Sequence, residues 1–329
     1  MMDALIARFP AQLQEALTIG QEATIHASEQ PIHQVYVAGL GGSGIGANFV
    51  AEFVREECKV PYTIGKGYEI PAHVGKNTLA IASSYSGNTE ETLSAFEQMV
   101  ESGAKIVVIA SGGKLIAKAK DLGLDYIQLP GGWPSPRACL GFSMVQQLFV
   151  LHKLGLISNR CIEQVKAAHE LLEQEKEAIQ DQAKDIARDL LGKLPIIYTT
   201  DRMEAVAVRL RQQLNENSKI LCWHHVVPEM NHNELVGWRQ ENKDLAVIYL
   251  RNEDDYQRNQ VRININKEII SSYTNTIIEI NSKGNALVER AIYLVHLSDW
   301  ISFHLAAMRE VDPVEIKVID YLKGELAKV

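Results

Sequence analysis

Short apolar runs alternate with longer segments of helical periodicity along most of this 329-residue chain. Each run has the length of a strand and each following segment the length of a helix, which is typical of parallel sheets with crossover helices. The pattern restarts near residue 194, so the sequence predicts two successive α/β units. The apolar runs lie at residues 35–38, 78–82, 105–110, 194–198, 245–250 and 276–280.

A polar segment separates the two patterns. Residues 160–191 are rich in Glu, Gln, Lys and Ala and carry Leu and Ile at helical spacing, which predicts one long connecting helix. We expect a first domain over residues 1–155, a connecting helix over 156–190 and a second domain over 191–329. Two domains agree with the usual size of roughly 100–200 residues each.

The charge and hydropathy of the chain limit the kinds of molecule that it can be expected to bind. A formal net charge of −8 disfavours nucleic acid, because proteins that bind it need a basic face for the phosphates. A small anionic ligand is compatible with this charge, since a local site can be positive on an acidic protein. The sequence contains no stretch of about 18 apolar residues, so we expect no membrane-spanning segment.

The cysteines and the N-terminus predict a cytoplasmic protein. The cysteine spacing includes no C-x-x-C pair and suits neither a disulfide framework nor a zinc site, so we expect reduced thiols. No long apolar run precedes Pro10, which argues against a signal peptide. The cysteines are Cys58, Cys139, Cys161 and Cys222.

A glycine-rich segment follows the first apolar run. It is Gly39-Leu40-Gly41-Gly42-Ser43-Gly44-Ile45-Gly46. Glycines let the backbone approach a ligand, and the next helix offers its N-terminal N–H groups to an anion. The letters also fit a dinucleotide fingerprint, but that motif needs an acidic residue about 20 positions later, and no acid follows the next strand, where Gly65 and Lys66 stand. The segment therefore favours a phosphate or sugar ligand, with plain turn geometry as the bland alternative.

A cluster of hydroxyls follows the second apolar run. The segment is Ser83-Ser84-Tyr85-Ser86-Gly87-Asn88-Thr89-Glu90-Glu91-Thr92. Hydroxyl donors beside a helix N-terminus can hold a phosphate without Lys or Arg. The alternative is a helix cap with solvated serines, since Ser and Thr favour caps. Three serines and a threonine within residues 83–89 are more than one cap needs, so the cluster predicts phosphate binding.

These two motifs and three later segments resemble a known family. The hydroxyl cluster resembles the phosphate loop of sugar isomerase (SIS) domains, and the glycine segment resembles the opening loop of the bifunctional phosphoglucose/phosphomannose isomerases. The later matches are Pro136-Arg137-Ala138-x-Leu140-Gly141, Asn215-Glu216-Asn217-Ser218-Lys219 and Pro228-Glu229-Met230-Asn231-His232-Asn233-Glu234. Because the matches occur in the family's order across both halves, the resemblance covers most of the chain.

The resemblance implies an α/β fold of two SIS-type domains, each a parallel sheet flanked by helices. It also implies a homodimer that interconverts glucose 6-phosphate, and mannose 6-phosphate, with fructose 6-phosphate through a cis-enediol. No metal and no organic cofactor would be required. The 6-phosphate of the hexose would bind to Gly42, Ser43, Ser84, Ser86 and Thr89.

Four residues acquire catalytic roles through the resemblance. Glu216 matches the base that moves a proton between C1 and C2, and Arg137 matches the cation that stabilises the enediolate oxygen. His232 and Lys323 match the residues that open the sugar ring, a task suited to an imidazole that titrates near neutrality. The non-catalytic alternatives for Glu216, Arg137 and His232 are a solvated glutamate, a surface arginine and a structural histidine. A metal site at His224, His225, His232 and Glu229 is disfavoured, because the spacing fits no H-E-x-x-H pattern.

The C-terminal segment departs from the family in two places. Residues 312–323 resemble the family's Asp-Pro-Thr-Pro-Val-x-x-Ile-Asp-x-Leu-Lys, but Val314 and Glu315 replace its Thr-Pro pair. This change leaves the preference for glucose or mannose open. Lys317 is also new, and it could substitute for Lys323 or crowd it.

Three rival functions remain at this stage. A non-catalytic phosphosugar-binding protein would use the same loops, but it would not need Glu216, Arg137 and His232 together. Another SIS enzyme, such as a glucosamine-type deaminating isomerase or an aldose epimerase, would share the phosphate loop. A nucleotide-binding oxidoreductase is disfavoured by the missing acidic residue after the second strand.

Overall fold

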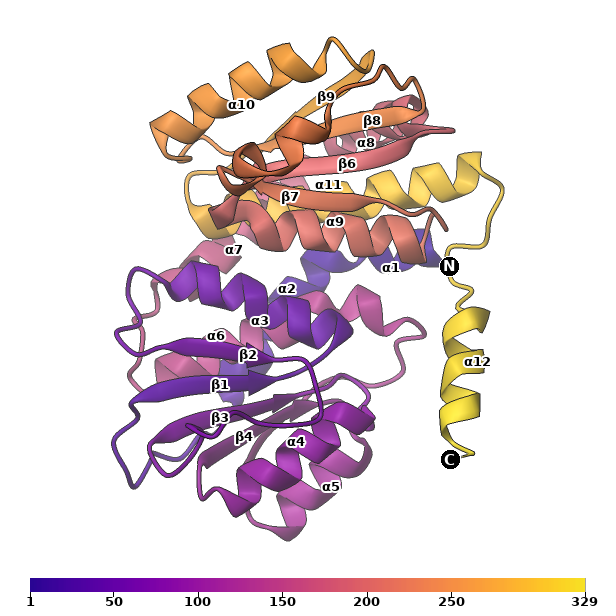
Figure 1. Ribbon diagram of the computed structural model, residues 1–329. Coiled ribbons are helices and arrows are strands. Elements are labelled where there is room, and N and C mark those ends of the chain that lie inside the picture. Colours follow the sequence, from indigo (N-terminus) through magenta and orange to yellow (C-terminus); the bar gives the residue numbers. More distant parts are fainter. Residues whose placement is uncertain (329) are drawn as a thin grey trace. The chain divides into compact units, whose positions relative to one another are not determined.

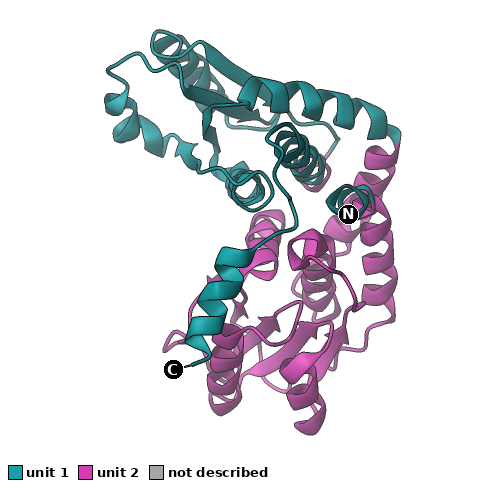
Figure 2. Cartoon of the chain, turned by 90° about the vertical axis from the view of Figure 1, so that its right-hand side faces the viewer, with its two compact units in different colours: residues 1–7, 174–285, 290–329 teal, residues 8–173, 286–289 magenta. Residues whose placement is uncertain are grey.

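The computed structural model describes residues 1–328, which form two compact units (Figure 2). Unit 2 comprises residues 8–173 and 286–289, and unit 1 comprises residues 1–7, 174–285 and the described residues from 290 onward. All four cysteines are free thiols. Among the described residues, every helix is too short or too polar to cross a membrane.

Unit 2 is built on a five-stranded sheet in which all neighbouring strands are parallel. Its spatial order is β2-β1-β3-β4-β5. The central strand β3 is buried at all six positions, as expected for a strand covered on both faces. The strands are β1 (Gln34–Ala38), β2 (Tyr62–Gly65), β3 (Thr78–Ser83), β4 (Lys105–Ala110) and β5 (Asp125–Gln128).

Helices cover both faces of this sheet (Figure 1). On one face, α4 packs Ala95, Phe96 and Met99, at helical spacing, against alternate residues of β1, β3 and β4. The helix α5 covers the same face, while α3 and α6 lie on the other. The helices of unit 2 are α2 (Phe9–Glu22), α3 (Gly41–Val54), α4 (Glu90–Glu101), α5 (Gly113–Asp121), α6 (Leu140–Lys153) and α7 (Arg160–Gln174).

Unit 1 has a parallel four-stranded sheet in the order β7-β6-β8-β9. The helix α10 covers one face, and α9 and α11 cover the other (Figure 1). The elements are α1 (Met2–Ala7), α8 (Lys176–Leu190), β6 (Leu194–Thr200), α9 (Glu204–Glu216), β7 (Trp223–Val227), β8 (Leu245–Arg251), α10 (Gln257–Ile270), β9 (Thr276–Asn281), α11 (Leu287–Met308) and α12 (Lys317–Leu326).

The predicted architecture of two α/β units is confirmed, because each of the six apolar runs forms a strand. The single helix predicted over residues 160–191 is wrong. The chain forms α7 and α8 instead, with a break at Glu175. Core-facing residues recur every three or four positions from Val165 to Leu190, and Glu175 falls where an apolar residue would continue them. Its carboxylate pairs with Lys283 at 2.6 Å, so the stripe is interrupted by a charge. The domain limits given above remain predictions.

Candidate active site

The strand order of unit 2 determines where its loops can meet a ligand. The chain leaves β1 towards β2 on one side and leaves β3 towards β4 on the other. Open α/β sheets bind ligands at the carboxyl ends of strands at such a switch point. The glycine segment follows β1 and the hydroxyl cluster follows β3, so both predicted motifs lie at this edge.

Glycine is required where the loop after β1 touches its neighbours. A Cβ at Gly39 would lie 2.9 Å from the carbonyl oxygen of Ser83, and a Cβ at Gly44 would lie 2.5 Å from the oxygen of Gly39. Larger side chains would push the loop away from the hydroxyl cluster. Ser43 lies in the first turn of α3 and is only 5% exposed.

The hydroxyl cluster forms a closed loop rather than a helix cap. Thr89 occupies the cap position of α4 but makes no capping hydrogen bond. Its Oγ1 lies 2.8 Å from Ser84 Oγ, which also accepts a hydrogen bond from the Gly87 N–H at 3.2 Å. Ser86 is exposed, and its Oγ accepts from the Asn88 N–H. The N–H groups of the first turn of α4 are therefore available beside several hydroxyls, as an anion site requires.

The loops that follow β4 and β5 hold the hydroxyl cluster in place. Gly87 has a φ of +68°, and a Cβ there would lie 1.9 Å from the carbonyl oxygen of Gly112. Asn88 Oδ1 accepts a hydrogen bond from the Lys114 N–H at 3.0 Å. Tyr85 donates its phenolic hydrogen to Pro130 O at 2.9 Å, and burial raises its pKa to about 12, so the phenol stays protonated.

Arg137 lies beside the glycine segment. It belongs to a short 3-10 helix, η1 (Pro136–Cys139), that leads into α6. A Cβ at Gly42 would lie 3.4 Å from Pro136 O and 4.0 Å from Arg137 Cα, so the two segments are in close contact. Arg137 is only 7% exposed, which contradicts the alternative of a surface arginine. Unit 2 thus carries a buried cation next to its glycine segment.

Two further residues at this edge were not predicted from the sequence. Ser135 is 2% exposed, and its Oγ has no hydrogen-bond partner within residues 1–328. Lys66 follows β2, and its Cε lies 3.5 Å from the Cβ position of Gly44. Its ammonium donates to Asn48 Oδ1 at 2.7 Å. Neither residue belongs to a motif, so only the folded chain reveals them as additional donors.

Glu216 is the last residue of α9. A bidentate pair between Arg209 and Asp299, with N···O distances of 3.0 and 2.8 Å, fastens this helix to α11. Asn217 then donates to Ser302 Oγ at 2.9 Å, and Lys219 donates to the backbone oxygen of Glu216. These contacts hold the end of α9 firmly, and they explain why a lysine follows the glutamate by three positions.

His232 ends a short 3-10 helix, η3 (Glu229–His232), in the crossover from β7 to β8. Its side chain is exposed, whereas Met230 two residues earlier is fully buried. Asn231 donates to Asn266 Oδ1 at 2.6 Å on α10. Within residues 1–328, no three His, Cys, Asp or Glu side chains are placed to hold a metal ion.

Lys323 lies on α12, whose residues are all exposed. Lys317 begins the same helix. The two lysines are six positions apart, which places them about 120° apart around the helix axis. The segment before α12 contacts the turn at Glu216, because Lys219 also donates to the carbonyl oxygen of Glu315 at 2.8 Å.

The structure therefore gathers one set of predicted residues and keeps the other on separate segments. Unit 2 brings its predicted residues to the carboxyl edge of its sheet, with Ser86 at the exposed rim. Unit 1 places its residues at the end of α9, on η3 and on α12. The first set is Gly42, Ser43, Ser84, Ser86, Thr89 and Arg137, and the second is Glu216, His232 and Lys323.

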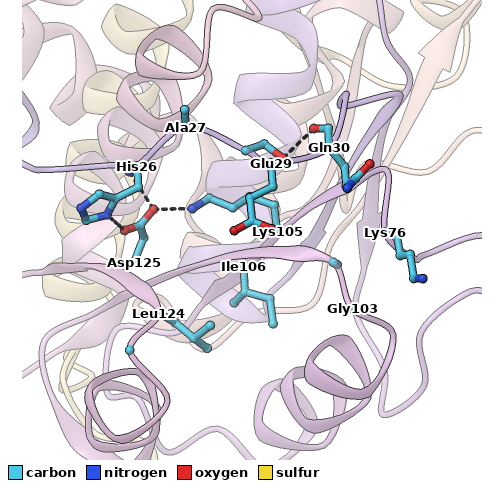
Figure 3. A pocket seen from close by; sticks show the side chains of 13 residues that line it. His26, Ala27, Glu29, Gln30, Lys76, Gly103, Lys105, Ile106, Leu124 and Asp125 are labelled. Atoms are coloured by element: carbon cyan, nitrogen blue, oxygen red, sulfur yellow. Dashed lines mark hydrogen bonds and ion pairs between the residues drawn. The ribbon is translucent and has the colours of Figure 1, made fainter.

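A cavity of about 330 Å³ lies at the opposite edge of the unit 2 sheet (Figure 3). Asp125, at the start of β5, accepts hydrogen bonds there from Lys105 Nζ at 2.7 Å and from His26 Nδ1 at 2.6 Å. Burial raises the pKa of Asp125, but the hydrogen bonds from Lys105 and His26 outweigh burial, so the net shift is downward. Because both carboxylate oxygens are engaged, we assign Asp125 a structural role: it ties the segment before β1 to the sheet.

Comparisons with known proteins match the two halves of the chain to two separate family models. Residues 30–155 match the SIS domain model, and residues 179–326 match the model of the bacterial phospho-glucose isomerase C-terminal SIS domain. The structure also resembles the C-terminal domain of glucosamine-fructose-6-phosphate aminotransferase from Francisella tularensis, with a TM-score of 0.76 and 14% identity over 94% of this chain and 97% of that chain. At that identity the likeness speaks for the fold alone.

Full-length relatives carry higher identity. The chain is 39% identical to a bifunctional phosphoglucose/phosphomannose isomerase of Caldicellulosiruptor bescii, with 98% of each chain covered. It is 36% identical to the protein of the same description from Aquifex aeolicus, with 91% of this chain and 92% of that protein covered.

Proposed function

Because the chain belongs to the bifunctional phosphoglucose/phosphomannose isomerase family, we propose that it interconverts glucose 6-phosphate and mannose 6-phosphate with fructose 6-phosphate. The similarity over nearly the whole chain to relatives of that description carries this proposal. The two aldoses differ only in configuration at C2, and C2 is planar in a cis-enediol. One intermediate therefore connects both aldoses with the ketose.

In this proposal the 6-phosphate binds at the carboxyl edge of the unit 2 sheet. Ser84 and Thr89 offer hydroxyls 2.8 Å apart, and Ser86 offers a third at the rim. Ser43 and the backbone of Gly42 face the same edge from α3. Hydrogen bonds from hydroxyls and from a helix N-terminus suit a phosphate, because these donors direct partial positive charges towards the anion without a lysine or arginine side chain.

The chemical step then needs a base and a stabiliser of negative charge. Glu216 takes the proton from C2 of the open-chain aldose and delivers it to C1, while the hydroxyl proton on O2 passes to O1, which yields the ketose. Arg137 stabilises the negative charge that develops on the enediolate oxygen. The firm attachment of α9 to α11 supports the role of Glu216, because a base must be held in place to act on two adjacent carbons.

Ring opening precedes this step, because hexose 6-phosphates are mostly cyclic. We assign it to His232, which can pass a proton to the ring oxygen as the C1–O5 bond breaks and take one back from the anomeric hydroxyl, with assistance from Lys323. An exposed imidazole suits the task, because its two ring nitrogens can donate and accept protons. Whether Lys317 replaces Lys323 depends on which face of α12 meets the sugar.

We further propose that the enzyme is a cytoplasmic homodimer. Apolar side chains are exposed around the edge strand β7: Leu221 is 81% exposed, Trp223 38% and Val236 61%. Exposed apolar groups of this kind often mark a protein interface. Because His232 lies in the crossover that follows β7, a second copy packed here could receive His232 into its own site.

A coupled assay with each hexose 6-phosphate tests the proposal. We expect turnover of both aldoses to fructose 6-phosphate without added metal. A protein that gains melting temperature from these sugars but turns over neither would instead be a phosphosugar-binding protein.

A further inference from the structure

Glu234 lies two residues after His232, and its carboxylate accepts hydrogen bonds from two aromatic side chains. Tyr198 Oη donates to Glu234 Oε1 at 2.5 Å, and Trp223 Nε1 donates to the same oxygen at 3.1 Å. Trp238 Nε1 in turn donates to Tyr198 Oη at 3.1 Å. A chain of hydrogen bonds therefore runs from the sheet of unit 1 to the segment that carries His232.

The Tyr198 end of this chain is rigid. Tyr198 lies on β6 and is fully buried, so its ring cannot move without disturbing the core. Burial raises the pKa of Tyr198, and the hydrogen bond to Glu234 raises it further, so the phenol remains a donor at neutral pH. Hydrogen bonds to a carboxylate are about twice as strong as neutral ones.

A second anchor fixes the segment before His232. Met230 is fully buried, and Asn231 donates to Asn266 Oδ1 at 2.6 Å. By contrast, the His232 side chain makes no hydrogen bond to another residue within 1–328, so the backbone on either side has to set the place of the imidazole. Asn233 closes the segment, because it donates to Glu229 Oε1 at 2.8 Å and accepts from the Glu234 N–H at 2.6 Å.

We propose that Glu234, held by Tyr198 and Trp223, is a positioning residue that places His232 for opening of the sugar ring. The inference rests on the proposed function, in which His232 carries out that step. Misplacing a catalytic group by about 1 Å can cost up to about 100-fold in rate. We expect loss of the Tyr198 hydrogen bond to slow ring opening by about tenfold, since Trp223 would still hold the carboxylate.

Tyr249 provides a matched control for Tyr198. The two tyrosines are paired across β6 and β8, their ring centroids lie 5.6 Å apart, and both are fully buried. The Tyr249 hydroxyl has no hydrogen-bond partner within residues 1–328. Tyr198→Phe and Tyr249→Phe therefore delete the same atom from the same core, but only the first deletion reaches Glu234.

The experiment compares kcat with the deuterium isotope effect of glucose 6-phosphate labelled at C2. Breaking the C2–H bond gives an isotope effect only while proton transfer limits the rate. If Tyr198→Phe slows ring opening about tenfold, ring opening replaces proton transfer as the slow step, so kcat falls by up to about tenfold and the isotope effect shrinks towards one, while Tyr249→Phe leaves both unchanged. A second pair tests the carboxylate directly: Glu234→Gln keeps an acceptor and retains most of the rate, whereas Glu234→Leu behaves like a stronger version of Tyr198→Phe.

Two results would overturn the inference alone. One is a Tyr198→Phe enzyme with the kcat and isotope effect of Tyr249→Phe, and the other is a lowered kcat with an undiminished isotope effect, which would indicate a general structural role. If Tyr198→Phe does not fold, the half-buried Glu234 pair decides by the same criteria. An inactive wild-type enzyme would contradict the proposed function itself, and a fully active His232→Ala enzyme would contradict the role of His232; both would remove the basis of the inference.

Discussion

The hydroxyl of Thr89 offers a sharp test of phosphate binding. Thr89→Val removes that hydroxyl and keeps the branched shape of the side chain. Thr89 makes no capping hydrogen bond to α4, so its loss should leave the helix intact. Ser84 Oγ loses the partner at 2.8 Å but still accepts from the Gly87 N–H at 3.2 Å, so the loop should keep its form.

The magnitude follows from one donor lost to a charged ligand. A hydrogen bond to a charged group contributes about 1.5–3 kcal/mol. Since about 1.4 kcal/mol corresponds to a tenfold change in an equilibrium constant, KM for glucose 6-phosphate should rise by about 10- to 100-fold. The phosphate is remote from C1 and C2, so kcat should change much less than KM.

Initial rates with glucose 6-phosphate and the inhibition constant of inorganic phosphate measure the effect. The same helix supplies the control, because Thr92 lies three residues later, is fully buried and has an Oγ1 without a hydrogen-bond partner within residues 1–328. Thr92→Val makes the same chemical change at a hydroxyl buried inside α4, and it should leave both constants unaltered. An unchanged KM in Thr89→Val, or an equal change in both variants, would refute phosphate binding by this hydroxyl.

Three further predictions concern the base, the subunits and the stability of unit 2. Glu216→Gln removes the proton acceptor, so kcat should fall by about 100- to 10,000-fold while a linear phosphorylated analogue still binds; retention of most activity would contradict the assignment. If His232 serves the neighbouring subunit, a hybrid dimer of Glu216→Gln and His232→Ala chains should recover about half of the wild-type activity per dimer, because one site then carries both lesions and the other none; a hybrid as inactive as its parents would place His232 in its own subunit. Asp125→Asn should lower the free energy of unfolding by about 1.5–3 kcal/mol at neutral pH. Because the pKa of Asp125 is lowered in the folded state, its contribution is present above the ordinary value of 3.8 and is lost as pH falls through the lowered pKa. Urea unfolding at several pH values should therefore show the two proteins converging in acid, and a difference independent of pH would contradict this account.

The fold could be predicted because the central strands of both sheets are buried on two faces. Such strands are continuous apolar runs, and β3 and β4 stand out from the polar segments beside them. The edge strand β7 was not predicted, since it contains Trp223, His224 and His225 and is only partly buried. The break between α7 and α8 was not predicted either, because neither Gly nor Pro marks it and one charged position in an apolar stripe, such as Glu175, does not by itself end a helix.

The candidate site could be predicted only as far as its residues lie in motifs. The loops after β1 and β3 could be predicted, because glycines and hydroxyl residues follow directly after apolar runs. The approach of Gly42 to Pro136 and the burial of Arg137 and Ser135 depend on contacts between residues far apart in the sequence. The role inferred for Glu234 depends on Tyr198, which lies 36 residues earlier.

The switch point of the unit 1 sheet explains why the phosphate is assigned to unit 2. In the order β7-β6-β8-β9, the corresponding loops follow β6 and β8. Thr200, at the end of β6, donates its hydroxyl to Asp255 Oδ1 at 2.6 Å, and Asn252 donates its N–H to the other carboxylate oxygen at 3.3 Å. Burial raises the pKa of Asp255, although these two partners oppose the shift. In unit 2 the hydroxyl donors at this edge can reach a ligand. In unit 1 the donors Thr200 and Asn252 are instead hydrogen-bonded to the buried carboxyl group of Asp255. An anion approaching that loop would meet a group of its own charge when Asp255 is ionised, and donors already in use when it is not. The two parallel sheets therefore differ in the hydrogen-bond donors that they offer at equivalent edges. The edge that carries the hydroxyl cluster after β3 is the one suited to a phosphate.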